Sequence, residues 1–576
     1  MNERASVKTQ PQGNRARARA TPKGRQVDPK AREEVRSLLE DAPRRRDLLI
    51  EYLHRIQDRH GHLTAARLVA LAEEMKLAMT EVYEVATFYH HFDVVKEGEA
   101  APPAITVRVC DSISCEMAGA NELLARLPGI LGNSVRVLHA PCIGRCETAP
   151  AAAVGQNPVP HASAEQIAAL VKAKAVKHPG AGAKHPHLDI VNPPCIDYAA
   201  YCAKGGYSLA GACIDGARKR EDVIAVMENS GLRGLGGAGF PAGRKWKAVA
   251  SEPPPRLLAI NIDEGEPGTF KDRWYLERDP HRFIEGALIA AWAVGIDEVY
   301  VYLRDEYHGC RAILEREIAA LKANPPCKLP PIHLRRGAGA YICGEESAMI
   351  ESIEGKRGMP RLRPPYVAQV GLFNRPTLEH NMETLHWVRE ILERGAEWFA
   401  SQGRNGRKGL RSFSVSGRVK KPGVHLAPAG ITARELIAEY CGGMLEGHSF
   451  YGYLPGGASG GILPASMADI PLDFDTLNQY GCFIGSAAVV ILSDKDRATA
   501  AARNLTKFFS EESCGQCTPC RVGTAKALKL IEKGKWNQPL LKELSQAMMD
   551  ASICGLGQAA PNPVLSVMKY FPNEIA

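Results

Sequence analysis

The sequence predicts a multidomain α/β protein, and three observations lead to that prediction. The chain has 576 residues, which is enough for three or four domains of ordinary size. Its hydrophobic content of 45% and charged content of 24% are typical of a globular protein with a large buried core. Apolar strands such as AITVRVC and LLAINI each run into a polar turn and then into a segment of helical periodicity.

The first 26 residues are strongly basic. They hold seven Lys or Arg against one acid, Glu3, which is +6 of the total charge of +8. We interpret residues 1–29 as a basic disordered tail. A tail of this kind can also bind an acidic partner, but it has no interleaved aromatic residues for base stacking, so we expect no nucleic-acid partner.

The sequence predicts no membrane partner. The longest apolar run, GALIAAWAVG at 286–295, is half of the roughly 20 residues that cross a bilayer. The N-terminus has no apolar core of a secretory signal, so we expect a cytoplasmic protein. Its 16 cysteines then predict metal ligands, catalytic thiols or core residues in place of disulfides.

Three cysteines near the C-terminus follow one another at a fixed spacing. Cys514, Cys517 and Cys520 form C-x2-C-x2-C, which lets one loop supply three ligands of a cubane cluster. Cys554 is the predicted fourth ligand, because glycines flank it and an intervening helical hairpin can return it to the loop. We therefore predict a [4Fe-4S] cluster. Structural zinc is the alternative, although zinc sites tend to pair one C-x2-C with another.

A second set of cysteines lies in the N-terminal third. Cys110 and Cys115 form C-x4-C after one apolar strand, and Cys142 and Cys146 form C-x3-C after another. Two pairs on neighbouring loops suit a [2Fe-2S] cluster, in which each iron takes two cysteines. Zinc is again the alternative. Two clusters in one chain indicate an electron conduit, which needs a two-electron entry point such as a flavin or a nicotinamide.

The segment SGLRGLGGAGFPAGRKW, residues 230–246, is the candidate for that entry point. Gly234, Gly236 and Gly239 formally match G-x-G-x-x-G, but a predicted helix precedes them where a dinucleotide-binding turn has a strand. So many glycines favour a backbone that lies against a phosphate or a flat ring, with Lys245 neutralising the phosphate. A plain flexible loop is the alternative.

Acidic residues gather at two further turns. An apolar strand ends in Asn261, Asp263, Glu264 and Glu266, at the kind of strand end where α/β folds bind ligands. Glu345 and Glu346 lie at a predicted helix start within GAGAYICGEESA. These carboxylates either cap a helix or accept hydrogen bonds from flavin ring N–H groups and ribose hydroxyls.

The motifs RGLGGAGFPAGRKW, NIDEGEPGTFKDR, YICGEESA, HNMETL, ESCGQCTPCRVG and SICGLG together resemble the flavin-bearing, NADH-binding subunit of respiratory complex I and its soluble relatives. The N-terminal part, with EVYEVATFYHHF, resembles the small thioredoxin-like [2Fe-2S] subunit that accompanies it. The resemblance covers nearly all of the chain from about residue 30 onward and implies a fusion of the two.

Within that family, LRPPYVAQVGLFNRPTLEHNMETLHWV is most similar to the beta subunit of NAD-dependent, molybdenum- or tungsten-containing formate dehydrogenase. Leu235 stands where complex I usually has a second arginine, and His380 stands where the family commonly has asparagine. The diaphorase subunit of NAD-reducing hydrogenase is the alternative. A non-catalytic iron–sulfur scaffold is the alternative of another class.

The resemblance implies FMN, NAD, one [4Fe-4S] and one [2Fe-2S] cluster, with hydride passing directly between NAD and FMN, so that no side chain acts as a catalytic acid or base. It implies FMN ligands Gly234, Gly236, Gly237, Lys245, Asn261, Asp263, Asn381 and Thr384. Phe240 and Tyr366 would flank the adenine of NAD, and Glu266 and Glu346 would contact its nicotinamide end. The implied partner is a pterin-containing alpha subunit with iron–sulfur clusters, in a hetero-oligomer.

The predicted domain order follows from these motifs and the resemblance. After the tail we expect a helical bundle at 30–95, a thioredoxin-like [2Fe-2S] domain at 100–172, a linker at 173–194, a Rossmann-like FMN/NAD domain at 195–400, a ubiquitin-like β-grasp domain at 408–495 and a helical [4Fe-4S] domain at 498–576.

Overall fold

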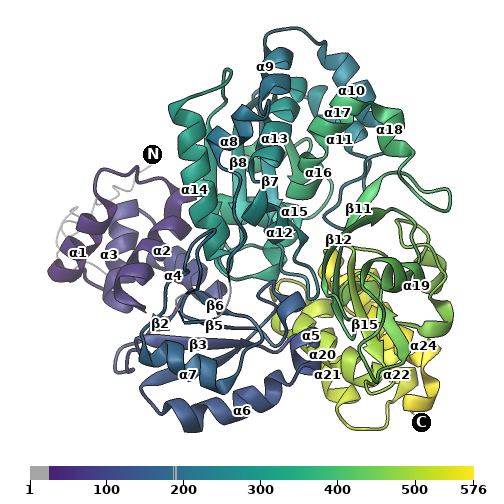
Figure 1. The fold of residues 1–576 in the computed structure, drawn as a ribbon. Coiled ribbons are helices and arrows are strands. Elements are labelled where there is room, and N and C mark those ends of the chain that lie inside the picture. Colours follow the sequence, from purple (N-terminus) through teal and green to yellow (C-terminus); the bar gives the residue numbers. More distant parts are fainter. Residues whose placement is uncertain (1–24, 186, 189–190, 576) are drawn as a thin grey trace, which may run out of the picture.

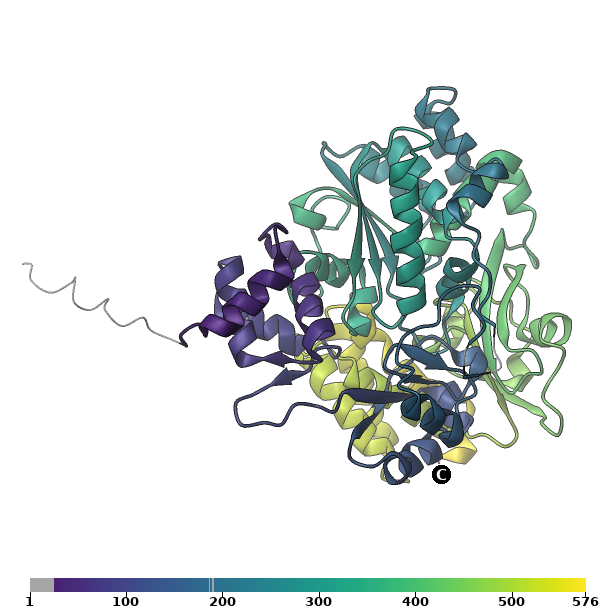
Figure 2. The same cartoon turned by 60° about the vertical axis from the view of Figure 1, so that its left-hand side comes forward.

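The computed structural model describes residues 25–185, 187–188 and 191–575. Figures 1 and 2 show an N-terminal helical module beside a large α/β body, with a small mixed sheet and the C-terminal helices packed below it. The predicted basic tail at 1–29 lies almost wholly outside the described residues, and the first helix begins at Pro29.

The N-terminal module consists of four helices in sequence. They are α1 (Pro29–Leu39), α2 (Leu49–His60), α3 (Ala65–Met75) and α4 (Met79–Phe88). Asp28 caps α1 by accepting a 2.7 Å hydrogen bond from the Ala31 N–H, and Gly61 ends α2 in the left-handed conformation. Apolar residues on the inner faces, such as Val35 and Leu53, are fully buried.

The next domain has a four-stranded sheet in the order β4-β3-β5-β6. Strands β3 (Ile105–Cys110) and β4 (Val135–Ala140) are parallel, and β5 (Ala152–Val154) and β6 (Asn157–Val159) extend the sheet antiparallel. Helices α6 (Ala120–Leu131) and α7 (Ala164–Lys172) pack on it, which completes the thioredoxin-like arrangement.

The described residues between 173 and 194 contain no helix, but part of this segment packs on the thioredoxin-like domain. His185 shares a 2.9 Å hydrogen bond with the Asn157 side chain, and Leu188 joins the core of that domain. The segment therefore differs from a freely extended spacer.

The central domain has a parallel sheet in the order β10-β7-β8-β9. Its strands are β7 (Arg256–Ile262), β8 (Ile296–Leu303), β9 (Ile332–Arg336) and β10 (Thr377–Asn381). Helices such as α13 (His281–Val294) and α14 (His308–Ala323) cover the sheet (Figure 1). All four carboxyl ends meet at one edge, where open α/β sheets bind ligands.

The following sheet has the order β12-β11-β15-β13-β14. Its strands are β11 (Leu410–Gly417), β12 (Gly423–Pro428), β13 (Phe450–Leu454), β14 (Leu463–Pro464) and β15 (Ala488–Ser493). The first and last strands, β11 and β15, lie side by side in parallel, and a short helix, α19 (Ala433–Glu435), follows the first hairpin. This order is that of the expected β-grasp fold.

The C-terminal region is helical. It comprises α20 (Ala498–Glu511), α21 (Thr518–Ile531), α22 (Gln538–Ala551), α23 (Gly555–Ala559) and α24 (Asn562–Tyr570). Helices α21 and α22 form the hairpin that the sequence predicts between Cys520 and Cys554. In the part of the chain that the structure describes, no helix is both long and apolar enough to cross a membrane.

Candidate functional site

The structure brings Cys514, Cys517, Cys520 and Cys554 together at the ends of three helices. The first three lie between α20 and the first turn of α21, where Cys517 is the N-cap residue. Cys554 is the N-cap of α23, and the α21–α22 hairpin returns it to the loop. The charge of Cys514 acts on both Cys520 and Cys554, as expected of thiols that share one site.

Burial raises the pKa of these thiols, to about 11 for Cys520 and about 12 for Cys554. The N–H groups of Gly557 and Leu556 point at Cys554 and lower its pKa in part. Gly557 lies so close to Cys520 that an added Cβ would come within 2.8 Å of the Cys520 Cβ. A buried set of thiols with backbone N–H donors suits an iron–sulfur cluster, which binds thiolates.

Cys110, Cys115, Cys142 and Cys146 also converge. Cys110 ends β3 opposite Ala140 at the end of β4, so the two loops start from the same sheet edge. Cys110 makes hydrogen bonds with Cys115 and Cys142, and the Sγ atoms of Cys142 and Cys146 are 3.3 Å apart. All four side chains are buried.

The surroundings of this second set favour a negatively charged group. Hydrogen bonds from neighbouring thiols, the Arg304 charge and the Gly144 N–H hold the pKa of Cys142 well below its usual range, although burial opposes them. The Gly144 N–H lies 3.4 Å from Cys142 Sγ, and the Ala151 N–H lies 3.4 Å from Cys115 Sγ. Such donors stabilise an anionic cluster.

Most of the predicted FMN residues lie at the carboxyl edge of the central sheet. Asn261 and Asn381 are paired across β7 and β10. Asn261 Nδ2 donates to the Gly344 carbonyl at 2.9 Å, and Thr384 Oγ1 accepts from the Leu235 N–H at 2.9 Å. Lys245, on α11 (Ala242–Ala250), donates to the main-chain carbonyl of Glu379 at 3.0 Å.

The glycine-rich segment and Asp263 fit a flavin. A Cβ on Gly236 would lie 3.0 Å from the Asn381 Cβ, and Gly237 has a φ of +134°, so neither position favours a side chain. Asp263 Oδ2 is buried and has no hydrogen-bond partner among the described residues. Burial raises the pKa of Asp263 well above its usual range. A ring N–H donor is the partner this oxygen lacks.

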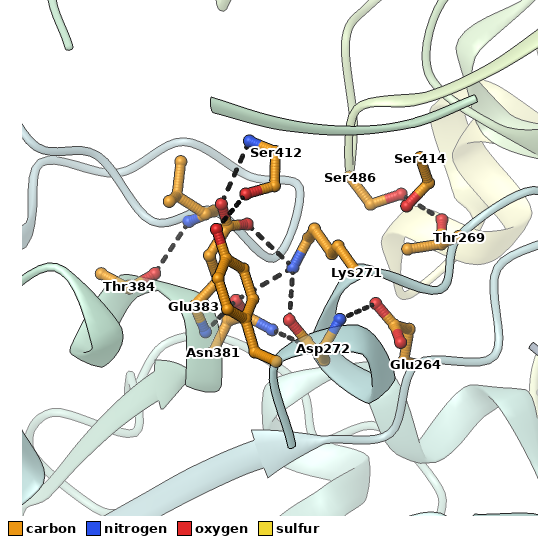
Figure 3. A network of polar contacts seen from close by, with 12 residues as sticks. Glu264, Thr269, Lys271, Asp272, Asn381, Glu383, Thr384, Ser412, Ser414 and Ser486 are labelled. Atoms are coloured by element: carbon orange, nitrogen blue, oxygen red, sulfur yellow. Dashed lines mark hydrogen bonds and ion pairs between the residues drawn. The ribbon is translucent and has the colours of Figure 1, made fainter. Parts of the chain in front are cut away.

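A buried polar network supports this edge, and its members are drawn in Figure 3. Lys271 Nζ forms ion pairs with Asp272 Oδ1 at 2.6 Å and with Glu383 Oε2 at 3.1 Å, and Asn381 Nδ2 donates to Asp272 Oδ2 at 2.7 Å. Burial opposes the charge of Lys271, but these carboxylates raise its pKa overall. The network fixes the orientation of Asn381.

Sequence reasoning missed this network. Lys271, Asp272 and Glu383 lie within the quoted motifs GTFKDR and HNMETL, but a charged residue in a motif does not reveal that it is buried. The signal was a Lys–Asp pair at the start of a helix, α12 (Lys271–Arg278), directly after the acidic turn.

The predicted NAD residues lie in two environments. Phe240 and Tyr366 are 47% and 56% exposed, so both rings can stack on a ligand from solvent. Glu266 is buried and accepts from the Ser459 side chain at 2.6 Å and from the Tyr341 hydroxyl. Glu346 begins α15 (Glu346–Ile353) and pairs with Arg363 at 2.9 Å, while Glu345 caps that helix.

His380 lies on the opposite face of β10 from Glu379 and Asn381, because side chains alternate along a strand. Its Nε2 accepts a 2.8 Å hydrogen bond from the Trp246 indole N–H. Burial holds the pKa of His380 well below its usual range, so the ring is neutral. His380 is thus a core residue beneath the site.

Two cavities flank this region. One of about 250 Å³ lies beside the glycine-rich segment, with Arg233, Leu235, Arg411 and Phe474 in its wall, and none of the predicted FMN residues lines it. A smaller one, about 20 Å³, is lined by Cys142, Asp263 and Tyr341, among others. The smaller cavity joins the N-terminal cysteine set to the predicted flavin edge.

Three family models match the chain. Residues 227–390 match the Nuo51 FMN-binding domain, and residues 35–175 match the thioredoxin-like [2Fe-2S] ferredoxin. Residues 500–576 match the iron–sulfur binding region of NADH-ubiquinone oxidoreductase F. The FMN, [2Fe-2S] and [4Fe-4S] groups predicted from the sequence are therefore those of the matching domains.

Curated relatives cover the C-terminal two thirds of the chain. The NADH-quinone oxidoreductase F subunit that is numbered 2 in Rhizobium meliloti is 40% identical over 391 residues, which is 65% of this chain and 93% of that protein. The mitochondrial NADH dehydrogenase [ubiquinone] flavoprotein 1 of Dictyostelium discoideum is 41% identical over 392 residues, 65% of this chain and 81% of that protein.

A solved structure spans the thioredoxin-like domain as well. A chain in the crystal structure of an NAD⁺-reducing [NiFe]-hydrogenase in the H₂-reduced state is 31% identical, with a TM-score of 0.79. The alignment covers 92% of this chain and 92% of that chain. Both chains therefore carry the two modules fused in the same order.

Proposed function

Because the chain belongs to the family of the NADH-quinone oxidoreductase F subunits, with a thioredoxin-like [2Fe-2S] domain fused before it, we propose that it is the diaphorase subunit of a formate dehydrogenase. It is an NADH-oxidising type of electron-transfer subunit with FMN and iron–sulfur domains. The proposed partner is a formate-oxidising alpha subunit with a molybdenum or tungsten pterin and its own clusters. Formate then loses two electrons and a proton to give CO₂, and NAD⁺ takes up two electrons and a proton to give NADH.

The proposal assigns the binding of both ligands to this chain's residues. FMN, when bound, supplies a hydride acceptor that can also pass electrons one at a time. Asn261, Asp263 and Asn381 would hold it at the sheet edge, and Gly236 and Gly237 leave room for it. Phe240 and Tyr366 would orient NAD by stacking. No side chain of this set needs to take up or release a proton.

The arrangement of the two cysteine sets supports electron transfer in both directions from the flavin edge. Tyr341 lines the small cavity with Cys142 and Asp263. The charge of Cys554 also acts on Tyr341. One residue thus lies near both sets, so we propose that Cys110, Cys115, Cys142 and Cys146 hold the [2Fe-2S] cluster and that the C-terminal set holds the [4Fe-4S] cluster.

The observation that carries the choice of formate is the segment 362–388 together with Leu235. Leu235 is buried in the wall of the larger cavity and has no charge to offer where an arginine would have one. A hydrogenase diaphorase is the second candidate, and the 31% identity to the hydrogenase chain over 92% of this chain favours it. A scaffold without a flavin is disfavoured by the match to an FMN-binding domain.

The test is anaerobic purification of the native complex through a tag on this chain, followed by formate-dependent and hydrogen-dependent assays of NAD⁺ reduction. Formate activity with a co-purifying pterin subunit is the expected result. Hydrogen-dependent activity without formate activity would instead assign the chain to a hydrogenase. Artificial-dye reduction by NADH serves as the control for an intact flavin in both cases.

A further inference from the structure

Two histidines and an aspartate from three separate segments meet between the N-terminal helices and the central domain. His54 lies on α2, His91 follows α4, and Asp305 follows β8. One ring nitrogen of each histidine and one carboxylate oxygen of Asp305 all lie within 4.8 Å of one another. His54 is 2% exposed and Asp305 is 6% exposed, so the set is shielded from bulk water.

The hydrogen bonds of the two imidazoles leave ring nitrogens free. His54 Nε2 lies 2.8 Å from the Gly337 carbonyl oxygen, which requires an N–H there and a lone pair on Nδ1. His54 Nδ1 is buried with no partner among the described residues, and so is His91 Nε2. A histidine that donates one N–H to a backbone carbonyl and presents its other nitrogen has the tautomer of a metal ligand.

The charge around the set favours a cation. Arg336 Nη1 pairs with Asp58 at 2.6 Å, and Arg336 Nε donates to Asp305 Oδ1 at 2.5 Å. Asp305 and Asp58 against one guanidinium leave one negative charge, which lies 2.5 Å from His91 Nδ1 as a carboxylate oxygen of Asp305. Burial, with the charges of Arg336 and His91, holds the pKa of His54 well below its usual range, so this ring offers a lone pair at neutral pH.

We propose that His54, His91 and Asp305 form a binding site for a divalent transition-metal ion of the zinc type, which ties the N-terminal helical module to the central domain. Two imidazoles and one carboxylate are a common zinc donor set, and water completes the four positions. The metal replaces the proton shared by His91 and Asp305. The three donor atoms draw together to the roughly 3.3 Å separation that zinc bonds of about 2.0 Å impose.

This site is separate from the two cysteine sets and from the flavin edge. Its ligands come from segments that the proposed electron path does not use. The inference therefore stands whether the partner oxidises formate or hydrogen.

The test measures zinc and iron per chain in the native complex, purified anaerobically through a tag without histidines and then supplied with one equivalent of ZnCl₂. The variants are His54→Ala and the near-isosteric Asp305→Asn. His425→Ala is the matched control, because His425 shares a hydrogen bond only with the Lys421 carbonyl in the β-grasp domain. Iron content reports whether each variant folds.

The expected result is about one zinc per chain in the wild type and the control, with at least a tenfold loss in both site variants at unchanged iron content. Zinc K-edge absorption should show nitrogen and oxygen ligands near 2.0–2.1 Å and no sulfur shell. The proposal is overturned by zinc below about 0.1 per chain in the wild type, by zinc that Asp305→Asn retains, or by a sulfur shell near 2.3 Å, which places zinc on the cysteines.

Discussion

Arg304, directly after strand β8, donates a hydrogen bond of 2.7 Å from Nη2 to the main-chain carbonyl of Cys142. The same guanidinium donates to the Glu264 carbonyl in the acidic turn after β7. One buried cation therefore joins the N-terminal cysteine loop to the predicted flavin edge. The carboxylate of Glu306 at 3.0 Å and the charge of Cys142 contribute to a raised pKa for Arg304, so it stays charged.

Replacing Arg304 with glutamine should lower the reduction potential of the [2Fe-2S] cluster by about 50 mV, because a nearby positive charge stabilises the more negative reduced cluster. Arg304→Lys keeps the charge and should retain most of the potential. A redox titration followed by electron paramagnetic resonance measures both variants. An unchanged potential in Arg304→Gln would show that the cysteine set holds no redox centre or that the charge is screened from it.

Gly557→Ala should prevent assembly of the [4Fe-4S] cluster. The added Cβ would lie 2.5 Å from Ser552 Oγ and 2.8 Å from the Cys520 Cβ, so the Cys554 loop must move away. Iron should fall from about six to about two per chain, since only the [2Fe-2S] cluster remains. Gly555→Ala is the matched control, because its Cβ would meet nothing within 4 Å. Equal iron in the two variants would contradict the assigned ligand set.

Glu264 should make the flavin-free protein less stable as the pH rises. Burial, with the Asp272 charge, raises the pKa of Glu264 to about 7 in the folded protein, against about 4.3 when unfolded. The folded state thus holds a proton that the unfolded state has lost, so stability is full below about pH 4 and falls up to about pH 7.

Glu264→Gln removes this titration and still accepts hydrogen bonds at the start of α12. At pH 8 the variant should exceed the wild type by about 2 kcal/mol in unfolding free energy, and the two should converge near pH 4. Thermal unfolding across that pH range is the measurement. A constant difference between the two proteins would exclude a proton-linked cause.

Phe240→Ala should raise the KM for NADH about three- to tenfold with little change in kcat. Loss of one stacked aromatic ring costs about 0.5–1.5 kcal/mol, and it is lost equally from the ground and transition states. Leu426→Ala is the control, because Leu426 is similarly exposed, at 44%, but lies on β12 of the β-grasp sheet. A fall in kcat alone, with KM unchanged, would contradict a stacking role.

Much of this account follows from short-range patterns. The spacing of Cys514, Cys517 and Cys520 and the helical periodicity after them predict both the loop and the hairpin that returns Cys554. The helix before the glycine-rich segment, α10 (Arg220–Asn229), was likewise predicted, and it explains why that segment is no ordinary dinucleotide-binding turn.

The remainder depends on contacts between distant segments. Arg304 and Cys142 are far apart in the sequence, and nothing near either residue predicts their hydrogen bond. The burial of Lys271 beside Glu383 likewise arises only when β10 docks against β7. His380 departs from the family pattern, and only the alternation along β10 shows that its side chain faces Trp246.

The most direct test of the central claim is an anaerobic NADH titration of the purified, cluster-loaded chain, with FMN and iron measured on the same sample. We expect about one FMN and six irons per chain, bleaching of the flavin absorbance, and NADH-induced resonance signals from the clusters. A fully cluster-loaded protein that contains no FMN and oxidises no NADH would contradict the account and leave an iron–sulfur scaffold.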